Sequence, residues 1–477
     1  MRPRTPLLSF LLLLIAAPAA EAQTIADDEG PAERQTPVPG LTGAPPPPSA
    51  NPTGGLADLF APSRSNMLGG MFGLRDLLGQ YGISFGLQET SEVFGNVTGG
   101  IRQGAAYDGL TQMSVGLDTE KAFGWQGGVF NISALQIHGQ DLTAQNLAAL
   151  QPVSGIEAER STRLWEMWLQ QSVLNGAADI KIGQQSVDQE FMVSQYSGLF
   201  LNSVMGWPVV PTVDLYAGGP SYPLSSLGVR LRAQPAPNVT VLAGVFNDNP
   251  PGGPFENDSQ LRGAEAAGAA FNLNTGALWM GEVQYALNPP AADGRPQGLP
   301  GTYKFGAYYD SGAFPAQRMV LPGGGGAAEE AVPARIYQGN FSFYALADQM
   351  VWRPEADGPQ SLGVFARVQW APPDRNLISL GADAGADLKA PLPGRDDDTF
   401  GVGFGIARIS SDLNQAPRRG AETFIEITYQ VQVAPWWTVQ PDAQYILRPG
   451  GGLPDPQAPY KLIGNELVFG LRTNVVF

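Results

Sequence analysis

The stretch ETFIEITYQVQV, residues 422–433, decides the fold. Apolar and polar side chains alternate along most of it. One face of an extended chain carries Ile425, Ile427, Tyr429 and Val431, and the other carries Glu426, Thr428, Gln430 and Gln432. A period of two is typical of a β-strand whose two faces meet different surroundings. This stretch therefore predicts a strand with one apolar side and one polar side.

The same alternation recurs through the chain from residue 81 onward. Residues 303–310 and 363–370 repeat it, and similar runs lie near 81–94, 109–120, 128–138, 163–173, 177–187, 227–234, 237–247, 268–287, 335–350, 376–388, 399–410, 436–447 and 465–477. Dividing 268–287 at Thr275-Gly276 gives about seventeen candidate strands. Bacterial barrels have an even number of strands, so we expect about 16, that is 16 or 18.

Two features favour a membrane barrel over a soluble β-sandwich. Many segments approach the roughly 9–11 residues that a tilted strand needs to cross a bilayer. The polar faces also carry charges, such as Glu166 and Lys304, which a dry core could not hold unpaired. Aromatic residues near strand ends fit an interfacial girdle: Trp352, Trp370, Trp436 and Trp437. The predicted fold is an all-β, antiparallel transmembrane β-barrel over residues 81–477, in a Gram-negative outer membrane.

The segment before the barrel has the layout of an export signal and a leader. Arg2 and Arg4 precede an apolar run, and Ala20-Glu21-Ala22 forms a cleavage site, so residues 1–22 are predicted to be a signal peptide. Residues 23–66 are rich in Pro, Gly and Ala and include the run Pro45–Pro48, which predicts a disordered leader or tether. A short helical segment is expected over 67–80.

Composition excludes several classes of function. The chain of 477 residues has a formal net charge of -16 and lacks the clustered Lys and Arg of a nucleic-acid-binding protein. It has no Cys and one His, which leaves no zinc site. The run Gly323–Gly326 has no Lys-Ser/Thr after it, so it is not a phosphate loop. Asn247-Asp248-Asn249 lacks the spacing of a calcium loop and is interpreted as a turn. No cofactor is expected.

The C-terminal segment ends in Phe477. Phe469, Leu471, Val475 and Phe477 share one face of a predicted strand. A terminal Phe on an amphipathic strand resembles the signal that the outer-membrane barrel assembly machinery reads. We therefore expect that machinery to be a partner, together with the lipid of the membrane.

Several motifs together resemble the carbohydrate-selective porins of the OprB type. They are Gly73-Leu74-Arg75, residues 92–100 (EVFGNVTGG), Tyr107-Asp108-Gly109, residues 124–128 (GWQGG), residues 164–171 (LWEMWLQQ), Lys181-Ile182-Gly183, Phe200-Leu201-Asn202, Pro223-Leu224 and residues 228–231 (GVRL). The resemblance covers nearly the whole barrel and is densest between Gly73 and Phe246. It implies a 16-stranded channel that passes monosaccharides or small oligosaccharides by diffusion.

Candidate pore-lining residues follow from the polar faces of the strands. Glu166, Trp168 and Gln170 share one face and offer a sugar a carboxylate, a ring and an amide. The other candidates on predicted lumen faces are Arg230, Arg232, Lys304, Arg367, Asp383 and Glu426. Alternatively, these charges pair with one another and keep the lumen wet. The segment Asp188–Pro220 is the candidate for a loop that narrows the channel.

Other functions stay open at this point. A general porin without sugar preference has the same sequence features, and a homotrimer is one assembly that a porin allows. A barrel that serves as an anchor or adhesin would use the proline-rich leader to hold a partner. A hydrolytic enzyme would need a base, and the one histidine available is His138, at the end of a predicted strand. We interpret His138 as a strand-end residue at the rim of the barrel, so no enzymatic activity is expected.

Overall fold

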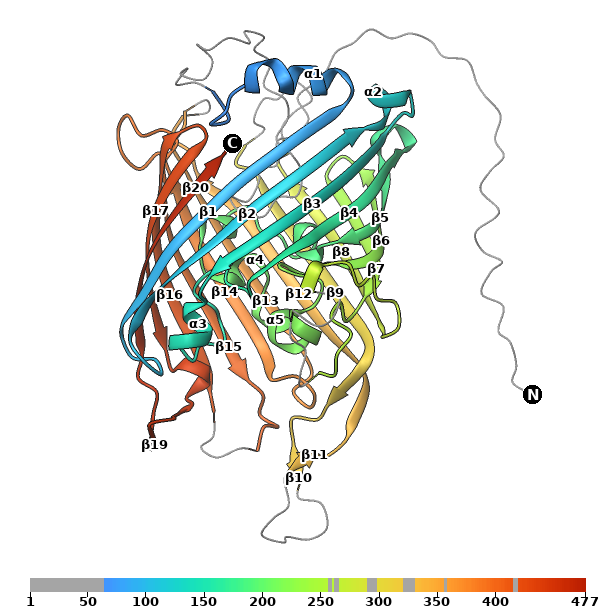
Figure 1. Ribbon diagram of the computed structural model, residues 1–477. Coiled ribbons are helices and arrows are strands. Elements are labelled where there is room, and N and C mark those ends of the chain that lie inside the picture. The colour runs from blue at the N-terminus through green and yellow to red at the C-terminus, as the bar shows by residue number, and fades with distance from the viewer. Residues whose placement is uncertain are drawn as a thin grey trace, which may run out of the picture.

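The computed structural model describes residues 64–255, 260, 266–289, 298–320, 331–355, 358–414 and 419–477. The predicted signal peptide and nearly all of the predicted leader lie outside these residues. Sixteen antiparallel strands form a closed barrel, in which each strand pairs with the next and β20 returns to β1 (Figure 1). The predicted fold class and the lower of the two strand numbers are confirmed.

The barrel strands are β1 (Ile83–Thr98), β2 (Gly104–Asp118), β3 (Gly128–Gly139), β4 (Ser161–Val173), β5 (Ala178–Gln185), β6 (Ser226–Ala236), β7 (Val239–Asn247), β8 (Ala277–Leu287), β9 (Gly301–Pro315), β12 (Ile336–Trp352), β13 (Ser361–Trp370), β14 (Ile378–Lys389), β15 (Thr399–Ile409), β16 (Ala421–Ala434), β17 (Trp437–Leu447) and β20 (Glu466–Val476). Two small hairpins lie outside the barrel: β10 (Met319–Val320) with β11 (Val332–Pro333), and β18 (Pro454–Asp455) with β19 (Ala458–Leu462).

One of the seventeen predicted segments, 268–275, is not a strand. Its side chains bind backbone groups locally: the Asn272 amide donates to the Asn249 carbonyl at 3.0 Å, and the Asn274 N–H donates to the Asn272 side chain at 2.9 Å. Asn side chains compete in this way with the ladder of a sheet. Phe271 also has a φ of 45°, which breaks an extended chain.

The two ends of the barrel differ in the length of their connections. Short turns join β4 to β5 and β16 to β17, whereas long segments join β3 to β4, β5 to β6 and β7 to β8. In barrels of outer membranes the short turns face the periplasm and the long loops face outward. The short-turn end also holds α1 (Leu74–Gln80), α2 (Thr119–Phe123) and the C-terminus (Figure 1). There Arg75 donates to the Phe477 carbonyl at 2.5 Å.

Burial along many of the barrel strands follows the predicted period of two. On β16, Ile425 and Ile427 face outward and are 42% and 49% exposed, whereas Phe424 and Glu426 face inward and are fully buried. The outer wall is thus largely apolar, and the inner wall carries the charges. Among the described residues, no helix is both long and apolar enough to cross a membrane.

Candidate functional site: the narrowed lumen

The connection between β5 and β6, residues 186–225, folds back inside the barrel, and we call it the internal loop (Figure 1). Phe200 and Val210 of this loop are buried against Phe365 and Ile378 of the opposite wall. The predicted narrowing segment, residues 188–220, lies within it. Its elements are η4 (Val187–Gln189), η5 (Ser197–Leu199), α4 (Ser203–Gly206), α5 (Val209–Asp214) and η6 (Tyr216–Gly218).

A buried arginine of the wall holds the internal loop by its carbonyl groups. The Arg367 guanidinium, on β13, donates to the carbonyls of Met192 at 2.8 Å, Val204 at 2.7 Å and Met205 at 3.0 Å. Its Nε lies 3.1 Å from Asp383 on β14, and neither side chain is more than 3% exposed. The rigid, planar fork of Arg suits it to several acceptors at once. Arg367 thus fixes the loop from the side of the wall.

Carboxylates of the wall hold the same loop by its amide groups. Glu426 accepts from the N–H of Leu201 at 2.5 Å and of Asn202 at 3.2 Å. Glu282 on β8 accepts from the Met192 N–H at 2.9 Å. These bonds satisfy backbone groups that would otherwise be buried without partners. Lys304 adds a bond to the Val193 carbonyl at 2.7 Å.

The connection between β3 and β4, residues 140–160, contacts the internal loop from the extracellular side. Its short helix, α3 (Leu142–Asn146), precedes a turn in which the Leu150 N–H donates to Glu422 of β16 at 2.8 Å. The Gly155 N–H donates to the Leu201 carbonyl at 2.8 Å. Two loops, each bound to the wall and to one another, therefore narrow the lumen.

A first group of charged side chains lies on β5, β6 and the internal loop, beside β4. We call it the Arg230 cluster; its members are Asp179, Lys181, Glu190, Arg230 and Arg232. Arg230 forms ion pairs with Asp179 and with Glu190 of the internal loop. It also donates to Gln170 at 3.3 Å. The Lys181 ammonium lies 4.3 Å from the centroid of the Trp168 ring.

A second group lies between the two loops and the wall of β1, β2, β4 and β20. We call it the Tyr222 cluster; its members are Glu92, Asp108, Arg163, Trp165, Tyr222 and Arg472. Arg472 donates to Glu92 at 2.6 Å, and the rings of Trp165 and Tyr222 meet edge to face, 6.4 Å apart. The Trp165 indole N–H and one oxygen of Glu92 are buried without a hydrogen-bond partner. Such a group offers donors, acceptors and ring faces to a polar solute.

The sequence-predicted residues divide between these environments. Trp168, Gln170, Arg230 and Arg232 lie together in and beside the Arg230 cluster. Glu166 lies close by, and its carboxylate accepts from the Ser186 N–H at 3.0 Å. The remaining four, Lys304, Arg367, Asp383 and Glu426, face inward and contact or support the internal loop.

Sequence reasoning did not select the Tyr222 cluster as a site. The period of two marks Glu92 and Arg472 as inward-facing, and this signal could have identified them. Tyr222 lies in an irregular loop, where no periodicity exists. Its position depends on a hydrogen bond from its hydroxyl to the Ile156 carbonyl at 2.9 Å, which joins the two loops.

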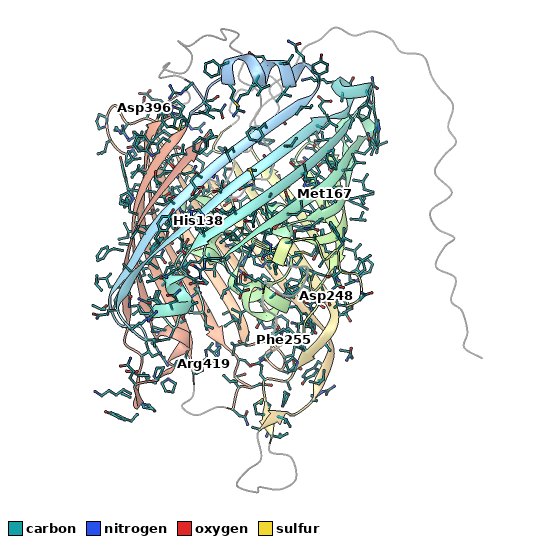
Figure 2. The ribbon with its side chains drawn as sticks, in the orientation of Figure 1. His138, Met167, Asp248, Phe255, Asp396 and Arg419 are labelled. Carbon is teal, nitrogen blue, oxygen red and sulfur yellow. The ribbon has the colours of Figure 1, made fainter. Side chains whose placement is uncertain are left out.

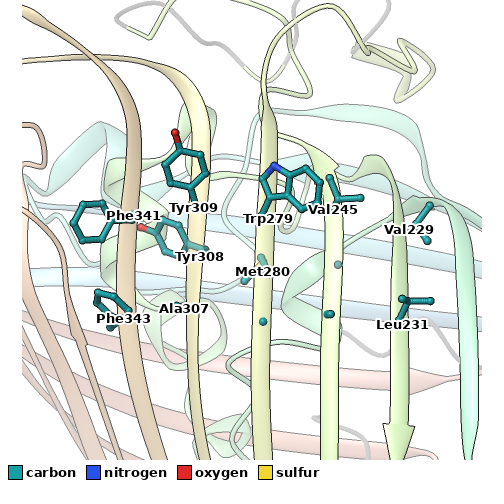
Figure 3. Close-up of a pocket in the computed structure, with 13 residues that line it drawn as sticks. Val229, Leu231, Val245, Trp279, Met280, Ala307, Tyr308, Tyr309, Phe341 and Phe343 are labelled. Atoms are coloured by element: carbon teal, nitrogen blue, oxygen red, sulfur yellow. The ribbon is translucent and has the colours of Figure 1, made fainter. Parts of the chain in front are cut away.

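The cavity shown in Figure 3 lies on the outer wall and is not part of the lumen. It has a volume of about 560 Å³ and spans the outward faces of β6 to β12, where Trp279, Tyr309 and Phe343 surround the small residues Gly281 and Ala307. Those three aromatic side chains are between 46% and 54% exposed. Its lining is mostly apolar, as expected for the lipid-facing side of a barrel.

The residues considered for other chemistry have other contacts in the structure. His138 lies on the outer wall, and its Nε2 is 3.2 Å from the Tyr107 hydroxyl. Asp248 accepts from Thr275 and Gly276 at 2.6 and 2.8 Å, which ties the two ends of a loop together. Among the described residues, no three His, Asp or Glu side chains are grouped as a metal site would require. Gly323–Gly326 lie outside the described residues.

Comparisons with known proteins agree with this geometry. The family model for the carbohydrate-selective porins, OprB family, matches residues 102–477. Porin B of Pseudomonas aeruginosa is 25% identical over 455 residues, which cover 88% of this chain and 93% of that protein. The high-pH structure of Pseudomonas putida OprB has a TM-score of 0.74 and 23% identity, with 88% of this chain and all of that chain covered. The low-pH structure of the same protein has a TM-score of 0.55 and 19% identity, with the same coverage.

Proposed function

Since this chain belongs to the OprB family of carbohydrate-selective porins, a family of β-barrel channels in the Gram-negative outer membrane, we propose that it passes small sugars into the periplasm. The solutes are monosaccharides or small oligosaccharides, and they move by passive diffusion. The observation that carries this proposal is the lumen, in which a loop fixed by Arg367 and Glu426 brings paired charges and aromatic rings close together.

Sugar recognition in this lumen is assigned to two sets of groups. The Trp168 ring and the Gln170 amide lie beside the Arg230 cluster, where Arg232 is 39% exposed. The Tyr222 cluster adds the unpartnered Trp165 indole N–H and Glu92 oxygen. Hydroxyl groups of a sugar bind carboxylates, guanidiniums and amides, and its C–H face stacks on a ring. Pore width and these lining groups then set the selectivity.

Export and assembly complete the proposal. Cleavage after Ala22 would release a mature chain that begins at Gln23, and the leader up to residue 66 would serve as a periplasmic tether. Phe477 would present the C-terminal strand to the barrel assembly machinery. The Phe477 N–H donates to the Leu87 carbonyl at 2.9 Å, so this terminus is part of the seam that closes the barrel.

Single-channel conductance in planar bilayers tests the function. Stable current steps that glucose or maltose blocks are expected for the native protein. Trp168→Ala should raise the sugar concentration for half-block about tenfold, which corresponds to about 1.4 kcal/mol. The matched control is Trp279→Ala, because Trp279 lies on the outer wall and is 54% exposed.

The alternatives give different results in the same measurement. Steps that no sugar alters would indicate a general porin without sugar preference. A folded, heat-modifiable barrel that conducts nothing would overturn the channel and favour an anchor or adhesin.

A further inference from the structure

Two buried carboxyl groups face each other near the extracellular end of β7, β8 and β9. Asp248 follows directly after β7, and Asp310 lies on β9. Asp310 pairs with Leu278 of β8 on one side and with Asn340 of β12 on the other. The two acidic residues are 1% and 0% exposed. Figure 2 shows Asp248 in the lower half of the barrel, toward the end opposite α1. The Arg230 cluster and the Tyr222 cluster include neither residue.

One oxygen of each carboxyl group has a hydrogen-bond donor, and the other has none. Asp248 Oδ1 accepts from Thr275 Oγ1 at 2.6 Å and from the Gly276 N–H at 2.8 Å. Asp310 Oδ1 accepts from the Gly312 N–H at 2.7 Å. The Oδ2 atoms of both residues are buried without a partner in the described part of the chain. A buried acceptor without a partner is costly, so these two oxygens are suited to a ligand.

Glycine at two positions allows the oxygen atoms to converge. A Cβ on Gly312 would lie 2.9 Å from Asp248 Oδ2 and 3.0 Å from Asp310 Oδ1. A Cβ on Gly276 would clash with Asp248 Oδ2 and lie 2.8 Å from Ser311 Oγ. A side chain at either position would displace these oxygens. Carboxylate and hydroxyl oxygens from two segments of the chain therefore surround one small region.

No described basic side chain balances the charge of this pair. Neither Asp248 nor Asp310 forms an ion pair with another described residue. Asp179 and Asp383, two other buried acids of the wall, each pair with an arginine. The carboxyl groups of Asp248 and Asp310 are also close enough to interact directly. A proton shared between them would leave one buried negative charge, whereas a divalent cation balances both charges.

We infer that Asp248 and Asp310 bind a calcium ion. Calcium takes about six to eight oxygen ligands in flexible geometry, from carboxylates, other protein oxygens and water. Ser311 Oγ and water molecules complete the set, so two carboxylates suffice and a third acidic or His side chain is not required. The ligands come from two separate segments, unlike those of a calcium loop. Magnesium demands stricter octahedral geometry at shorter distances, so calcium is the preferred ion.

The calcium ion joins parts of the chain that meet at this end of the barrel. Asp248 begins the connection between β7 and β8 and binds its far end through Thr275. Tyr216 of the internal loop lies beside the site, because a Cβ on Gly312 would be 2.8 Å from its ring. The Tyr216 hydroxyl donates to the Ala313 carbonyl at 2.5 Å. Calcium therefore stabilises the β7–β8 connection and the attachment of the internal loop to β9. Extracellular calcium sites have dissociation constants of about 10⁻⁴–10⁻³ M, and we expect this range here.

Terbium luminescence tests the site. Terbium(III) binds at oxygen-rich calcium sites and luminesces when a neighbouring tyrosine, here Tyr216, is excited. The full chain is refolded in detergent free of lipopolysaccharide, whose phosphates also bind cations. We expect saturable binding, and displacement of terbium by calcium at a lower concentration than by magnesium. Asp248→Asn and Asp310→Asn should each weaken terbium binding by roughly tenfold or more. Asp412→Asn, on an exposed loop, is the control and should leave binding unchanged.

Limited proteolysis shows where the ion acts. Removal of calcium by EGTA should speed cleavage of the β7–β8 connection in the native protein and leave cleavage within 140–160 unchanged. In Asp310→Asn, EGTA should have no effect. Absence of saturable terbium binding, or equal binding by the native protein and both Asp variants, would overturn the calcium site. Cleavage of the native β7–β8 connection that is insensitive to EGTA would also overturn it and favour a shared proton. If neither Asp variant shows the heat modifiability of a folded barrel, the EGTA response of the native protein decides.

Discussion

Arg367 on β13 and Asp383 on β14 are paired across neighbouring strands, with the Arg367 Nε 3.1 Å from a carboxylate oxygen of Asp383. The two other guanidinium nitrogens of Arg367 donate to carbonyl groups of the internal loop. One ion pair of the wall therefore supports the element that narrows the lumen. The carboxylate orients the guanidinium, and the guanidinium binds the carbonyl groups of Met192 and of Val204 and Met205 in α4. Stability of the barrel and width of the channel are linked at this point.

Arg367→Ala should destabilise the barrel and widen the channel. The variant leaves the Asp383 carboxylate buried without its partner, and such a loss typically lowers the free energy of unfolding by about 3–5 kcal/mol. It also frees the carbonyls of Met192 and Val204. We expect a lower urea midpoint of the refolded barrel and larger, noisier current steps. Arg408→Ala, on the exposed outer face of β15, is the control and should change neither. Unchanged current steps in Arg367→Ala would contradict the anchoring role.

Replacing glycine by alanine should have different effects at Gly281 on β8 and at Gly306 on β9. A Cβ on Gly281 meets nothing within 4 Å, whereas a Cβ on Gly306 would lie 2.2 Å from the Tyr344 ring. Tyr344 donates to Glu282 at 2.8 Å, and Glu282 holds the Met192 N–H. Gly306→Ala should therefore displace an anchor of the internal loop.

The measurement is the thermal transition of the barrel together with its conductance. Gly281→Ala should leave both close to native values. Gly306→Ala should lower the transition temperature, because overpacking reduces the free energy of unfolding by about 1–3 kcal/mol. It should also alter the current steps. Equal effects of the two substitutions would show that the contact beneath Tyr344 is unimportant.

The sequence predicted the barrel well because the period of two is a local property. In residues 422–433 the alternation of apolar and polar side chains assigns each residue to the outer or the inner face. Glu426 is placed on the inner face by this pattern alone, without knowledge of the neighbouring strands. The internal loop was predictable as a segment, since 188–220 is long, irregular and rich in Gly and Pro. Its contacts were not, because the carbonyls that Arg367 binds are backbone groups and leave no trace in the sequence.

The candidate site shows the same division. Period two placed Arg230 and Lys304 on the inner wall, but it could not distinguish a residue that meets solute from one that meets the loop. That distinction depends on where residues 186–225 fold. For His138, the alternation along β3 is enough to place the side chain on the outer wall. Its partners Tyr107 and Glu89 lie on two other strands, so the sequence of β3 alone does not identify them.

The connection between β3 and β4 should loosen as the pH rises. Burial raises the pKa of Glu157, and the neighbouring carboxylates of Asp141 and Asp108 raise it further. Burial also raises the pKa of Asp141. Both groups hold protons more tightly in the folded loop than in an unfolded one. Their contribution to stability is therefore present at low pH and is lost as the pH rises through the raised pKa values.

Limited proteolysis across a pH series measures this effect. Cleavage within 140–160 should increase at high pH in the native protein. Glu157→Gln keeps an acceptor for the N–H groups of Leu142 and Thr143 and cannot ionise, so its cleavage should depend less on pH. Glu120→Gln, on exposed α2, is the control. A pH response that Glu157→Gln leaves intact would assign the effect to other groups.

Ion preference should depend on Glu190 of the internal loop. Its carboxylate pairs with both Lys181 and Arg230, which leaves Asp179 as the other acid of the Arg230 cluster. Glu190→Gln removes one negative charge beside three basic side chains. Rings of like charge set the ion selectivity of a pore. The variant should therefore shift the zero-current potential in a salt gradient toward anion preference.

Asp412→Asn is the matched control for this measurement, because it removes the same charge from an exposed extracellular loop. Charges on exposed loops are screened over about 10 Å at 0.1 M salt, so the control should shift the potential little. The difference between the two variants should narrow as the salt concentration rises. Equal shifts in both variants would show that net charge, and not the Arg230 cluster, sets the ion preference. No shift in Glu190→Gln would show that permeating ions do not pass near this cluster.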